Sequence, residues 1–379
     1  MTAPAELPPP GRQSTTIAAQ VVTGRIFLLN SSQYADGVPS FVSVGRSGVV
    51  ACGRDANAKI SKIGRQALVP LLADPGAYTR QVATPDEPFA LPDSDGTLFG
   101  SDVDTVLKGQ RDCGAAVAII PARYVQAGDS PAFKALVRQA QAIERDDVIA
   151  AVPVAIAWLR EQQYLTQFIA GLNRIPHPKA LMFGDQKNPF DTVSAIVNFR
   201  RLLAETTDVG LWRADVLAAF DCLAHGGTFA AIGAGGSLRH LVPADETARS
   251  EQAAVHTPSV LLPHMLRYST GKVIADRYAN TPAPRCTCSV CNGVSLDRFN
   301  SLAGEVRTIA HAHNAAVWTQ WLADLFDHAT AAGRQRWWRG FCQAALDAHE
   351  QENTRLRQKH AFKPSLHLTK LATLLLPDE

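Results

Sequence analysis

Short apolar runs recur along the first two thirds of the chain and alternate with amphipathic stretches. The runs are rich in Val, Ile, Leu and Ala and are apolar on both faces, which is typical of buried parallel strands. The stretches between them, such as residues 130–146, have the spacing of helices with one apolar face. The predicted strands are 41–45, 67–74, 115–121, 148–157, 179–184, 209–212 and 229–233, and either 48–52 or 272–276 supplies an eighth.

This alternation predicts an α/β protein with a (β/α)8 TIM-type barrel, although an open doubly wound sheet would give the same pattern. Residues 216–227, VLAAFDCLAHGG, are predicted to form a helix. After residue 240 the pattern changes to a cysteine-rich stretch and a helical tail. We therefore expect a disordered lead at 1–35, the barrel at 36–280, and a zinc-binding and C-terminal helical region at 281–379.

Composition and charge narrow this picture only slightly. The chain has 379 residues, of which 46% are hydrophobic and 19% charged, and a net charge of +2. A nearly neutral chain has no overall basic field, so any nucleic-acid site must be a local patch. No apolar run reaches about 18 residues, and the N-terminus lacks the pattern of a secretory signal. The sequence thus predicts a cytoplasmic protein with no membrane partner.

Three cysteines lie close together in the segment CTCSVC at 286–291. Zinc prefers four tetrahedral ligands, and three thiolates with one imidazole supply them. The fourth ligand is expected from the helix that carries His311 and His313, and only one of the two can face the metal because residues two apart point about 200° away from each other. A site with four protein ligands is closed, which indicates structural Zn²⁺. The thiol ligands are Cys286, Cys288 and Cys291.

The spacing Cys-x-Cys-x2-Cys, followed by a helix with the pair His313-Asn314, resembles the zinc site of the tRNA-guanine transglycosylase family. The last ligand of that family is the His of an HN pair, so the resemblance implies that His313 binds the metal. It also implies a pentosyltransferase that replaces guanine in a polynucleotide with a 7-deazaguanine derivative through a covalent aspartyl intermediate. Departures from the family pattern resemble the branch that modifies DNA. DNA or tRNA as polymer, and a second copy or a partner subunit, stay open.

Base exchange at an N-glycosidic bond needs two carboxyl groups, one that meets the anomeric carbon and one that moves a proton to the leaving base. In α/β barrels such groups lie at the C-terminal ends of the strands. Asp74 follows a predicted strand in LLADPGAY, which resembles the Asp-Ser-Gly-Gly-Phe turn of the family. The resemblance implies proton transfer by Asp74. The alternative is that Asp74 only starts a turn.

The second acid lacks a clear counterpart. The family nucleophile lies in a Phe-Asp-Cys motif on a late strand, whereas Phe220-Asp221-Cys222 falls in a predicted helix and 229–236 has no acid. Two aspartates remain, and each follows an apolar run. Asp215 is the predicted nucleophile and Asp276 the alternative, while either one can equally be a surface or helix-capping carboxylate.

Further polar residues after the predicted strands are candidates for binding the base or a phosphate. The candidates are Asp185, Gln186, Gly235 and Arg239. A cluster of Arg and Trp at 334–339 fits either a contact to nucleic acid or a helix that buries its tryptophans. A second function class also fits the sequence, because the second acid motif is missing. This is a catalytically inactive zinc-containing barrel that binds nucleic acid or serves as a partner subunit.

Overall fold

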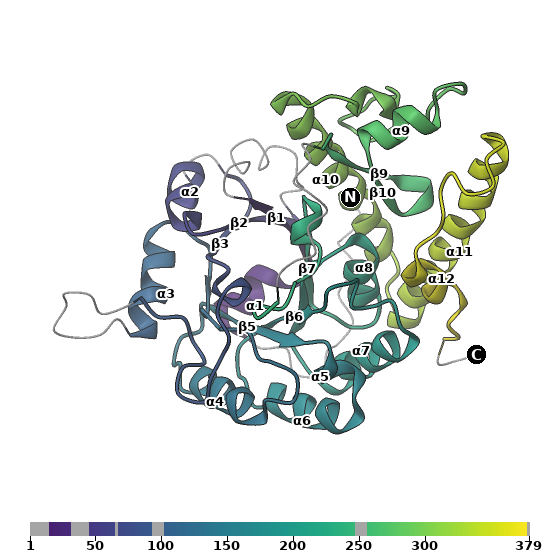
Figure 1. Ribbon diagram of the computed structural model, residues 1–379. Helices are drawn as coiled ribbons and strands as arrows, with labels where there is room; N and C mark the ends of the chain where they lie inside the picture. Colours follow the sequence, from purple (N-terminus) through teal and green to yellow (C-terminus); the bar gives the residue numbers. More distant parts are fainter. Residues whose placement is uncertain (1–14, 32–44, 65–66, 93–101, 247–255, 377–379) are drawn as a thin grey trace.

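The computed structural model describes residues 15–31, 45–64, 67–92, 102–246 and 256–376, and every statement below concerns these residues. Eight parallel strands surround a common axis, with helices on the outside (Figure 1). The predicted α/β barrel is therefore confirmed. The strands are β1 Arg25–Ser31, β2 Ser47–Cys52, β3 Leu71–Asp74, β4 Ala118–Ile119, β5 Val148–Ala155, β6 Lys179–Gly184, β7 Val209–Ala214 and β8 Phe229–Gly233.

The strand order is β3-β2-β1-β8-β7-β6-β5-β4, so β1, the first strand in the chain, pairs with β8, the last one. The backbone N–H of Ala116, just before β4, donates to the carbonyl of Leu71 in β3 at 2.7 Å. Strand β4 is short and continues in register along β5, with Ala118 opposite Val148. This contact nearly closes the barrel, which excludes the open doubly wound sheet.

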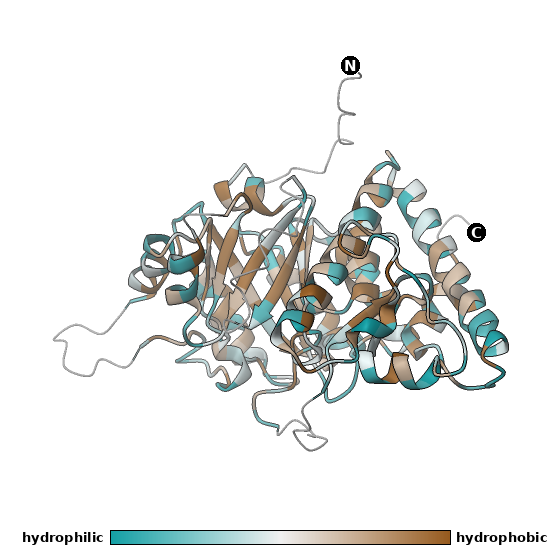
Figure 2. Ribbon diagram, turned by 90° about the horizontal axis from the view of Figure 1, so that it is seen from above, coloured by the Kyte–Doolittle hydropathy of each residue, from teal (hydrophilic) through white to brown (hydrophobic). Residues whose placement is uncertain are grey.

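Helices follow most strands on the outside of the barrel, and Figure 2 shows largely hydrophobic strands (brown) with helices on either side. Several of them begin at a side chain that caps the first free backbone N–H groups. Asp102, Asp129, Thr192 and Asp215 are such caps. The helices of this part are α1 Ile17–Val22, α2 Ala56–Ile63, α3 Val103–Asp112, α4 Ser130–Gln141, α5 Ala157–Arg160, α6 Gln162–Leu172, α7 Val193–Glu205 and α8 Val216–Ala224.

Two glycines in the strands make room for aromatic rings inside the barrel. Gly48 lies opposite Phe27 in the register, and a Cβ at Gly48 would come within 2.3 Å of the Phe27 ring. Gly210 has the same relation to Phe229, at 2.4 Å. Because interiors are close-packed, a side chain at either glycine would push a core ring out of place.

The C-terminal region packs against one side of the barrel (Figure 1). Its antiparallel hairpin, β9 Ser259–Leu262 and β10 Arg267–Thr270, lies on helix α10 Gly304–Phe326. Helix α11 Ala331–Arg355 lies on α8, where Trp338 stacks on Phe220 with ring centres 5.5 Å apart. None of the described helices combines the length and apolar character needed to span a bilayer. The elements are β9 Ser259–Leu262, β10 Arg267–Thr270, α9 Gly271–Arg277, α10 Gly304–Phe326, α11 Ala331–Arg355 and α12 Leu366–Thr373, with single 3-10 turns at Ala77–Thr79, Gly236–Leu238, Pro263–Met265 and Leu296–Phe299.

Three predictions about the elements need correction. Residues 17–31 form α1 and the first barrel strand, so the predicted disordered lead at 1–35 is wrong for that part. Strand β1 was missed because the Pro-rich start of the chain led all of 1–35 to be assigned to the lead, although RIFLLNS contains four consecutive apolar residues at 26–29. Residues 272–276 belong to helix α9, whose N-terminus is capped by the Thr270 side chain. The eight strands are completed by β1 and by 48–52, while the predicted strand at 41–45 lies almost wholly outside the described residues.

The predicted helix at 216–227 is confirmed as α8, and it places Asp221 away from the strand ends. Asp221 is buried and accepts two hydrogen bonds from Arg200 of α7, at 2.7 and 3.1 Å. Burial raises the pKa of Asp221, but His225 and Arg200 lower it by more, so the pKa is lower than the usual value. Asp221 therefore serves as an ion-pair anchor between two outer helices.

Candidate metal centre and barrel mouth

The three clustered cysteines meet one histidine in the folded chain. The ligand atoms of Cys286, Cys288, Cys291 and His313 all lie within 4.8 Å of one another. The Nδ1 atom of His313 is 3.2 Å from the Cys291 sulfur and 3.5 Å from the Cys288 sulfur. Three thiol groups and one imidazole form a donor set that suits a metal ion. The predicted ligands are thus brought together, and the group can hold a metal.

A tight turn explains how the three thiols converge. The N–H of Gly293 donates to the carbonyl of Cys286 at 2.8 Å, and the N–H of Cys291 donates to that of Cys288 at 3.0 Å. Gly293 has φ 83°, a left-handed conformation that glycine adopts without strain. Hydrogen bonds with Cys286 and Cys291 lower the pKa of Cys288, which favours the thiolate form that binds metals.

The helix α10 fixes the fourth ligand and its neighbour. The Nε2 atom of His313 lies 2.8 Å from the carbonyl of Leu261 in β9, which leaves Nδ1 directed at the thiols. Asn314 accepts from the N–H of Leu261 at 2.8 Å and donates to the carbonyl of Ser259 at 2.9 Å. His311, two residues earlier, lines a different hollow. The helix therefore separates the two histidines as its geometry predicts.

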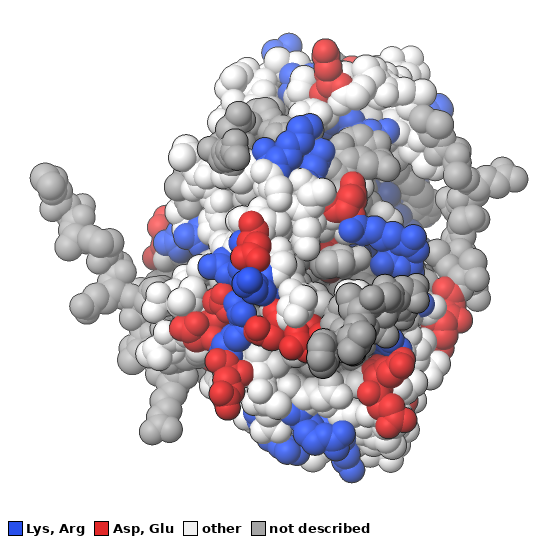
Figure 3. Space-filling view, turned by 90° about the vertical axis from the view of Figure 1, so that its left-hand side faces the viewer, with Lys and Arg blue, Asp and Glu red and all other residues white. Residues whose placement is uncertain are grey.

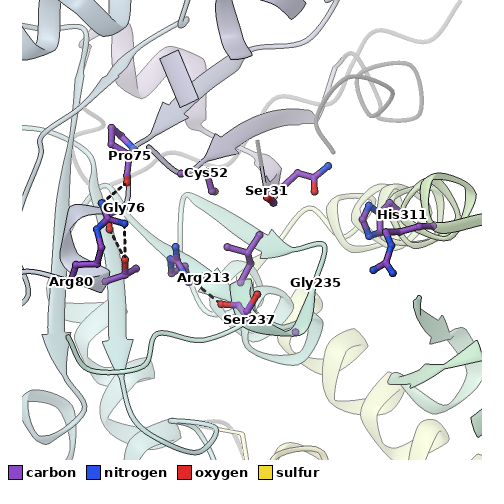
Figure 4. Close-up of a pocket in the computed structure, with 15 residues that line it drawn as sticks. Ser31, Cys52, Pro75, Gly76, Arg80, Arg213, Gly235, Ser237 and His311 are labelled. Carbon is purple, nitrogen blue, oxygen red and sulfur yellow. Dashed lines mark hydrogen bonds between the residues drawn. The ribbon is translucent and has the colours of Figure 1, made fainter. Parts of the chain in front are cut away.

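A hollow of about 460 Å³ opens at the C-terminal ends of the barrel strands, and we call it the mouth pocket (Figure 4). Its walls come from the ends of β1, β2, β3 and β7, the loop after β8, and helix α10. No Asp or Glu is among its described lining residues. The lining residues are Asn30, Ser31, Cys52, Gly53, Pro75, Gly76, Thr79, Arg80, Arg213, Gly235, Gly236, Ser237, Leu238, Arg307 and His311.

Asp74 ends strand β3 as predicted, but its carboxylate is buried and does not line the mouth pocket. One oxygen accepts from the N–H of Gly76 at 2.9 Å. The other accepts from the hydroxyl of Tyr78 at 2.6 Å and from the indole N–H of Trp212 at 3.1 Å. Three donors therefore hold this carboxylate in one orientation, and proton transfer by Asp74 stays a prediction.

Arg213 is a site residue to which the sequence analysis assigned no role. Its Nε donates to the Tyr78 hydroxyl at 2.8 Å, and its Nη1 lies 3.4 Å from the carbonyl of Ser237. Figure 4 shows Arg213 between Gly76 and Ser237, on the side of the mouth pocket opposite His311. A charged residue near the end of an apolar run, VGLWRA, was the available signal.

Asp215 lines a second hollow, of about 390 Å³, which we call the hairpin pocket. Its Oδ1 caps helix α8 by accepting from the N–H of Ala218 at 2.9 Å, and its Oδ2 lies 3.4 Å from the amide nitrogen of Asn188. The structure therefore does not bring Asp74 and Asp215 into one pocket. The hairpin pocket is lined by Asn188, Asp215, Val216, Leu217, Arg239, His240, Met265, Leu266, Arg267, Tyr268, His349, Lys363, Ser365 and Leu368.

Asp276, the alternative nucleophile, lies on helix α9 instead of at a strand end. It is exposed and forms an i,i+4 ion pair with Lys272 at 2.6 Å. Asp276 lines neither the mouth pocket nor the hairpin pocket. Of the two acids, only Asp215 follows a strand and lines a described hollow, and its role as nucleophile stays a prediction.

The predicted base-binding residues after β6 make contacts within the protein. Asp185 pairs with Arg160 at 2.9 Å, and its N–H donates to the carbonyl of Leu241 at 3.0 Å. The Gln186 amide donates to Glu246 at 2.6 Å. Both residues therefore hold the segment that follows the loop after β8 against the end of β6.

Gly235 and Arg239 share one loop but face different pockets. Gly235 lines the mouth pocket, as Figure 4 shows, whereas Arg239 is half-buried in the wall of the hairpin pocket. The guanidinium of Arg239 donates to the carbonyls of Gly233 and Ala234 and to the Ser259 hydroxyl, at 2.9–3.0 Å. It also lies 3.2 Å above the ring centre of Tyr268. Arg239 therefore ties the loop to the hairpin, and its phosphate contact stays a prediction.

The cluster of Arg and Trp at 334–339 was predicted either to contact nucleic acid or to bury its tryptophans. In the cluster at 334–339, Trp338 is buried against α8 and Arg334 lies over the ring of Phe326 at 5.9 Å. These contacts favour a helix that buries its tryptophans. Figure 3 shows basic and acidic side chains intermixed over the middle of the face that lies away from the C-terminal helices.

Comparisons with known proteins identify no family. No family model and no curated protein matches the chain. Among solved structures, the multifunctional pyruvate carboxylase from Rhizobium etli aligns with 12% identity and a TM-score of 0.34, over 90% of this chain and 36% of that one. The A. niger ochratoxinase aligns with 12% identity and a TM-score of 0.23, over 59% of this chain and 64% of that one. The chain thus spans less than two thirds of either structure, and neither likeness carries an argument about function.

Proposed function

We propose that this protein is a zinc-containing base-exchange enzyme of the guanine transglycosylase type. The observation that carries the proposal is the Cys3His centre appended to a parallel α/β barrel. The site suits structural zinc because four protein ligands leave no open position for a substrate. His313 holds one ligand position while its other ring nitrogen contacts strand β9, so the metal would stabilise the segment beside the hairpin.

The proposed reaction replaces guanine in a polynucleotide with a 7-deazaguanine derivative. A carboxylate oxygen of Asp215 would form a bond to C1′ of the nucleotide as the bond from C1′ to guanine breaks, and the departing base would take up a proton from water. The incoming base would then lose a proton, form its own bond to C1′ and release Asp215. The support for Asp215 is its position at the end of β7 and its place in the wall of the hairpin pocket.

A basic groove beside the hairpin pocket supports a polynucleotide as the partner. We call it the C-terminal groove, a hollow of about 710 Å³ between α11 and α12. Arg357, Lys359 and Lys363 are among its lining residues, and Glu350 is the one acid among those that the structure describes. Lys363 and His349 also line the hairpin pocket, so the two hollows adjoin. Cations along a groove suit the phosphates of a nucleic-acid strand.

The test is incorporation of a labelled 7-deazaguanine base into guanine-containing DNA and, separately, into tRNA. We expect the wild-type protein to label one of the polymers and Asp215→Asn to abolish labelling, because an amide is a far weaker nucleophile than a carboxylate. Asp276→Asn is the matched control and should label normally. Normal labelling by Asp215→Asn, or loss of labelling in Asp276→Asn, would contradict the role of Asp215.

A binding protein without exchange activity is the second candidate function. It is favoured by the state of Asp74, whose carboxylate is buried and held by three donors. In this case the wild-type protein would bind the polymer and label neither DNA nor tRNA, even in a cell extract that supplies partner subunits. Binding should then weaken when Lys359 and Lys363 are both replaced by Glu. The same double change at Lys134 and Arg138, which are exposed on α4, is the matched control.

A further inference from the structure

The mouth pocket is positively charged on its walls. Arg80, Arg213 and Arg307 line it, and its described lining includes no carboxylate. Arg80 follows the turn after β3, Arg213 lies near the end of β7, and Arg307 comes from α10. Three cations from distant parts of the chain thus line one hollow, and a hollow lined by one sign of charge favours an anion.

The backbone at Arg213 is unusual. Its φ of 53° is left-handed, and no other non-glycine residue inside a described strand or helix has a positive φ. This conformation costs a non-glycine residue about 1–3 kcal/mol, and such strain concentrates at ligand sites. The register with β8 shifts between Leu211 and Ala214. The adjacent residues Trp212 and Arg213 therefore both reach the pair Asp74–Tyr78, although neighbours in a regular strand point to opposite faces.

A chain of hydrogen bonds holds the guanidinium in place. Asp74 accepts from the Tyr78 hydroxyl at 2.6 Å, and that hydroxyl accepts from Nε of Arg213 at 2.8 Å. The guanidinium carbon also lies 5.1 Å from the centre of the Tyr78 ring. Burial lowers the pKa of Arg213, but Tyr78 and Asp74 raise it by more, so the guanidinium stays charged.

One edge of the guanidinium remains directed toward the hollow. Within the described chain, Nη2 has no hydrogen bond of its own, and it lies 3.7 Å from the position of a Cβ on Gly76. Gly76 itself has φ 64° and lines the pocket. A side chain at this glycine would narrow the approach to Nη2. The glycine thus keeps the open edge of Arg213 accessible from the mouth pocket.

We propose that the mouth pocket binds a phosphate group, with the open edge of Arg213 as the main contact and Arg80 and Arg307 at the rim. The Nη2 atom of Arg213 would donate to a phosphate oxygen, and such a charge-assisted hydrogen bond is strong and directional. The phosphate belongs either to a polynucleotide backbone or to a free nucleotide. The inference does not depend on base exchange, because it concerns binding alone.

The experiment measures the affinity of the zinc-loaded protein for three probes, namely thymidine, thymidine 5′-monophosphate and a ten-nucleotide oligo-dT. None of them contains guanine, so binding is separated from exchange. We expect thymidine to bind far more weakly than a phosphorylated probe. Binding of the monophosphate indicates a free nucleotide as ligand, whereas binding of the oligomer alone indicates a backbone phosphate.

Two substitutions test the contact itself. Arg213→Met removes the charge and should weaken the phosphorylated probe about tenfold or more, which corresponds to about 1.4 kcal/mol. It should also lower the salt dependence of oligomer binding by about one phosphate contact. Tyr78→Phe keeps the charge but removes the hydroxyl that orients it, and should weaken binding less than Arg213→Met does. Arg336→Met, an exposed arginine on α11, is the control and should bind normally.

The proposal is overturned if thymidine and its monophosphate bind equally and the oligomer binds equally to wild type and Arg213→Met. Should Arg213→Met fail to fold, Tyr78→Phe decides, and unchanged affinity and salt dependence in that variant would also overturn it. Loss of base exchange with intact oligo-dT binding would leave this site standing and remove only the proposed function.

Discussion

The metal segment and the barrel mouth are built in different ways. In the metal segment, three of four ligands come from a six-residue stretch, and a single turn directs their sulfur atoms together. At the mouth, Asp74 is held by Trp212, which lies 138 residues further along the chain, and Tyr78 by Arg213, 135 residues away. Local spacing sets the first arrangement, whereas the closure of the whole barrel sets the second.

This difference indicates which substitutions the protein should tolerate. A ligand lost from the metal segment removes an entire centre, because the remaining three groups no longer complete a tetrahedron. A partner lost at the mouth removes one link in a chain whose other members stay anchored by the barrel. Effects should therefore be largest in the metal segment and graded at the mouth.

The largest effect is expected for Cys288→Ser. Replacing this ligand should release the metal and destabilise the C-terminal region, since a structural zinc site contributes about 10–16 kcal/mol of apparent binding energy in small zinc-dependent peptides. Metal analysis and thermal unfolding measure both outcomes in protein purified without chelators. Cys113→Ser, a half-exposed thiol outside the cluster, is the control and should keep its metal.

The two histidines of α10 sharpen the same test. His313→Ala should behave like Cys288→Ser, while His311→Ala should retain the metal because His311 lines the mouth pocket. Metal loss in His311→Ala together with retention in His313→Ala would show that the helix is turned the other way. Full metal content in all of these variants would show that the Cys3His group is not the metal site.

The sequence allowed the metal ligands and most of the barrel to be predicted, because both depend on local spacing. Cys286, Cys288 and Cys291 are neighbours in the chain, and helix geometry separates His311 from His313. Most strands of the barrel are apolar runs long enough to recognise. Strand β1 escaped prediction because it was assigned to the Pro-rich lead. Helix α9 escaped prediction because its short apolar run resembles a strand, whereas the Thr270 side chain caps it as a helix.

The arrangement at the mouth could not be predicted in the same way. The sequence placed Asp74 at a strand end, but nothing local indicated that Tyr78 and Trp212 would both donate to it. Arg239 looked like a phosphate contact after a glycine-rich loop, yet it is held by Gly233, Ala234 and Ser259. Such contacts depend on the register between strands far apart in the chain, which no pattern in one strand encodes.

An intermediate effect is expected for Asp74→Asn. The amide can still accept from Gly76 through its oxygen, but its NH2 group would face the indole N–H of Trp212, which can only donate. Losing charge-assisted bonds in a buried site should cost on the order of 2–4 kcal/mol of unfolding free energy. Denaturant unfolding measures this cost, and metal content should stay unchanged.

Asp102, which caps α3 at the surface, supplies the control for that experiment. Asp102→Asn keeps a good capping residue and should leave the stability nearly unchanged. Equal stability of Asp74→Asn and wild type would mean that the bonds of Asp74 contribute little to the fold. The carboxylate would then be available for the proton transfer predicted from the sequence.

The smallest effect is expected at the opposite end of the barrel, where Lys179 begins strand β6. Its ammonium group is buried and donates to the carbonyl of Thr207 at 2.9 Å, and burial lowers its pKa from 10.5 to about 8 although Asp208 opposes the shift. Below pH 8 both the folded and the unfolded chain carry the charge, so the folded state bears the full cost of burying it. Between pH 8 and 10.5 the folded chain releases the proton while the unfolded chain keeps it, and stability should rise by about 1–3 kcal/mol relative to Lys179→Met. Denaturant unfolding of both proteins across this pH range gives the difference, and parallel profiles would show that Lys179 titrates alike in the folded and unfolded chain.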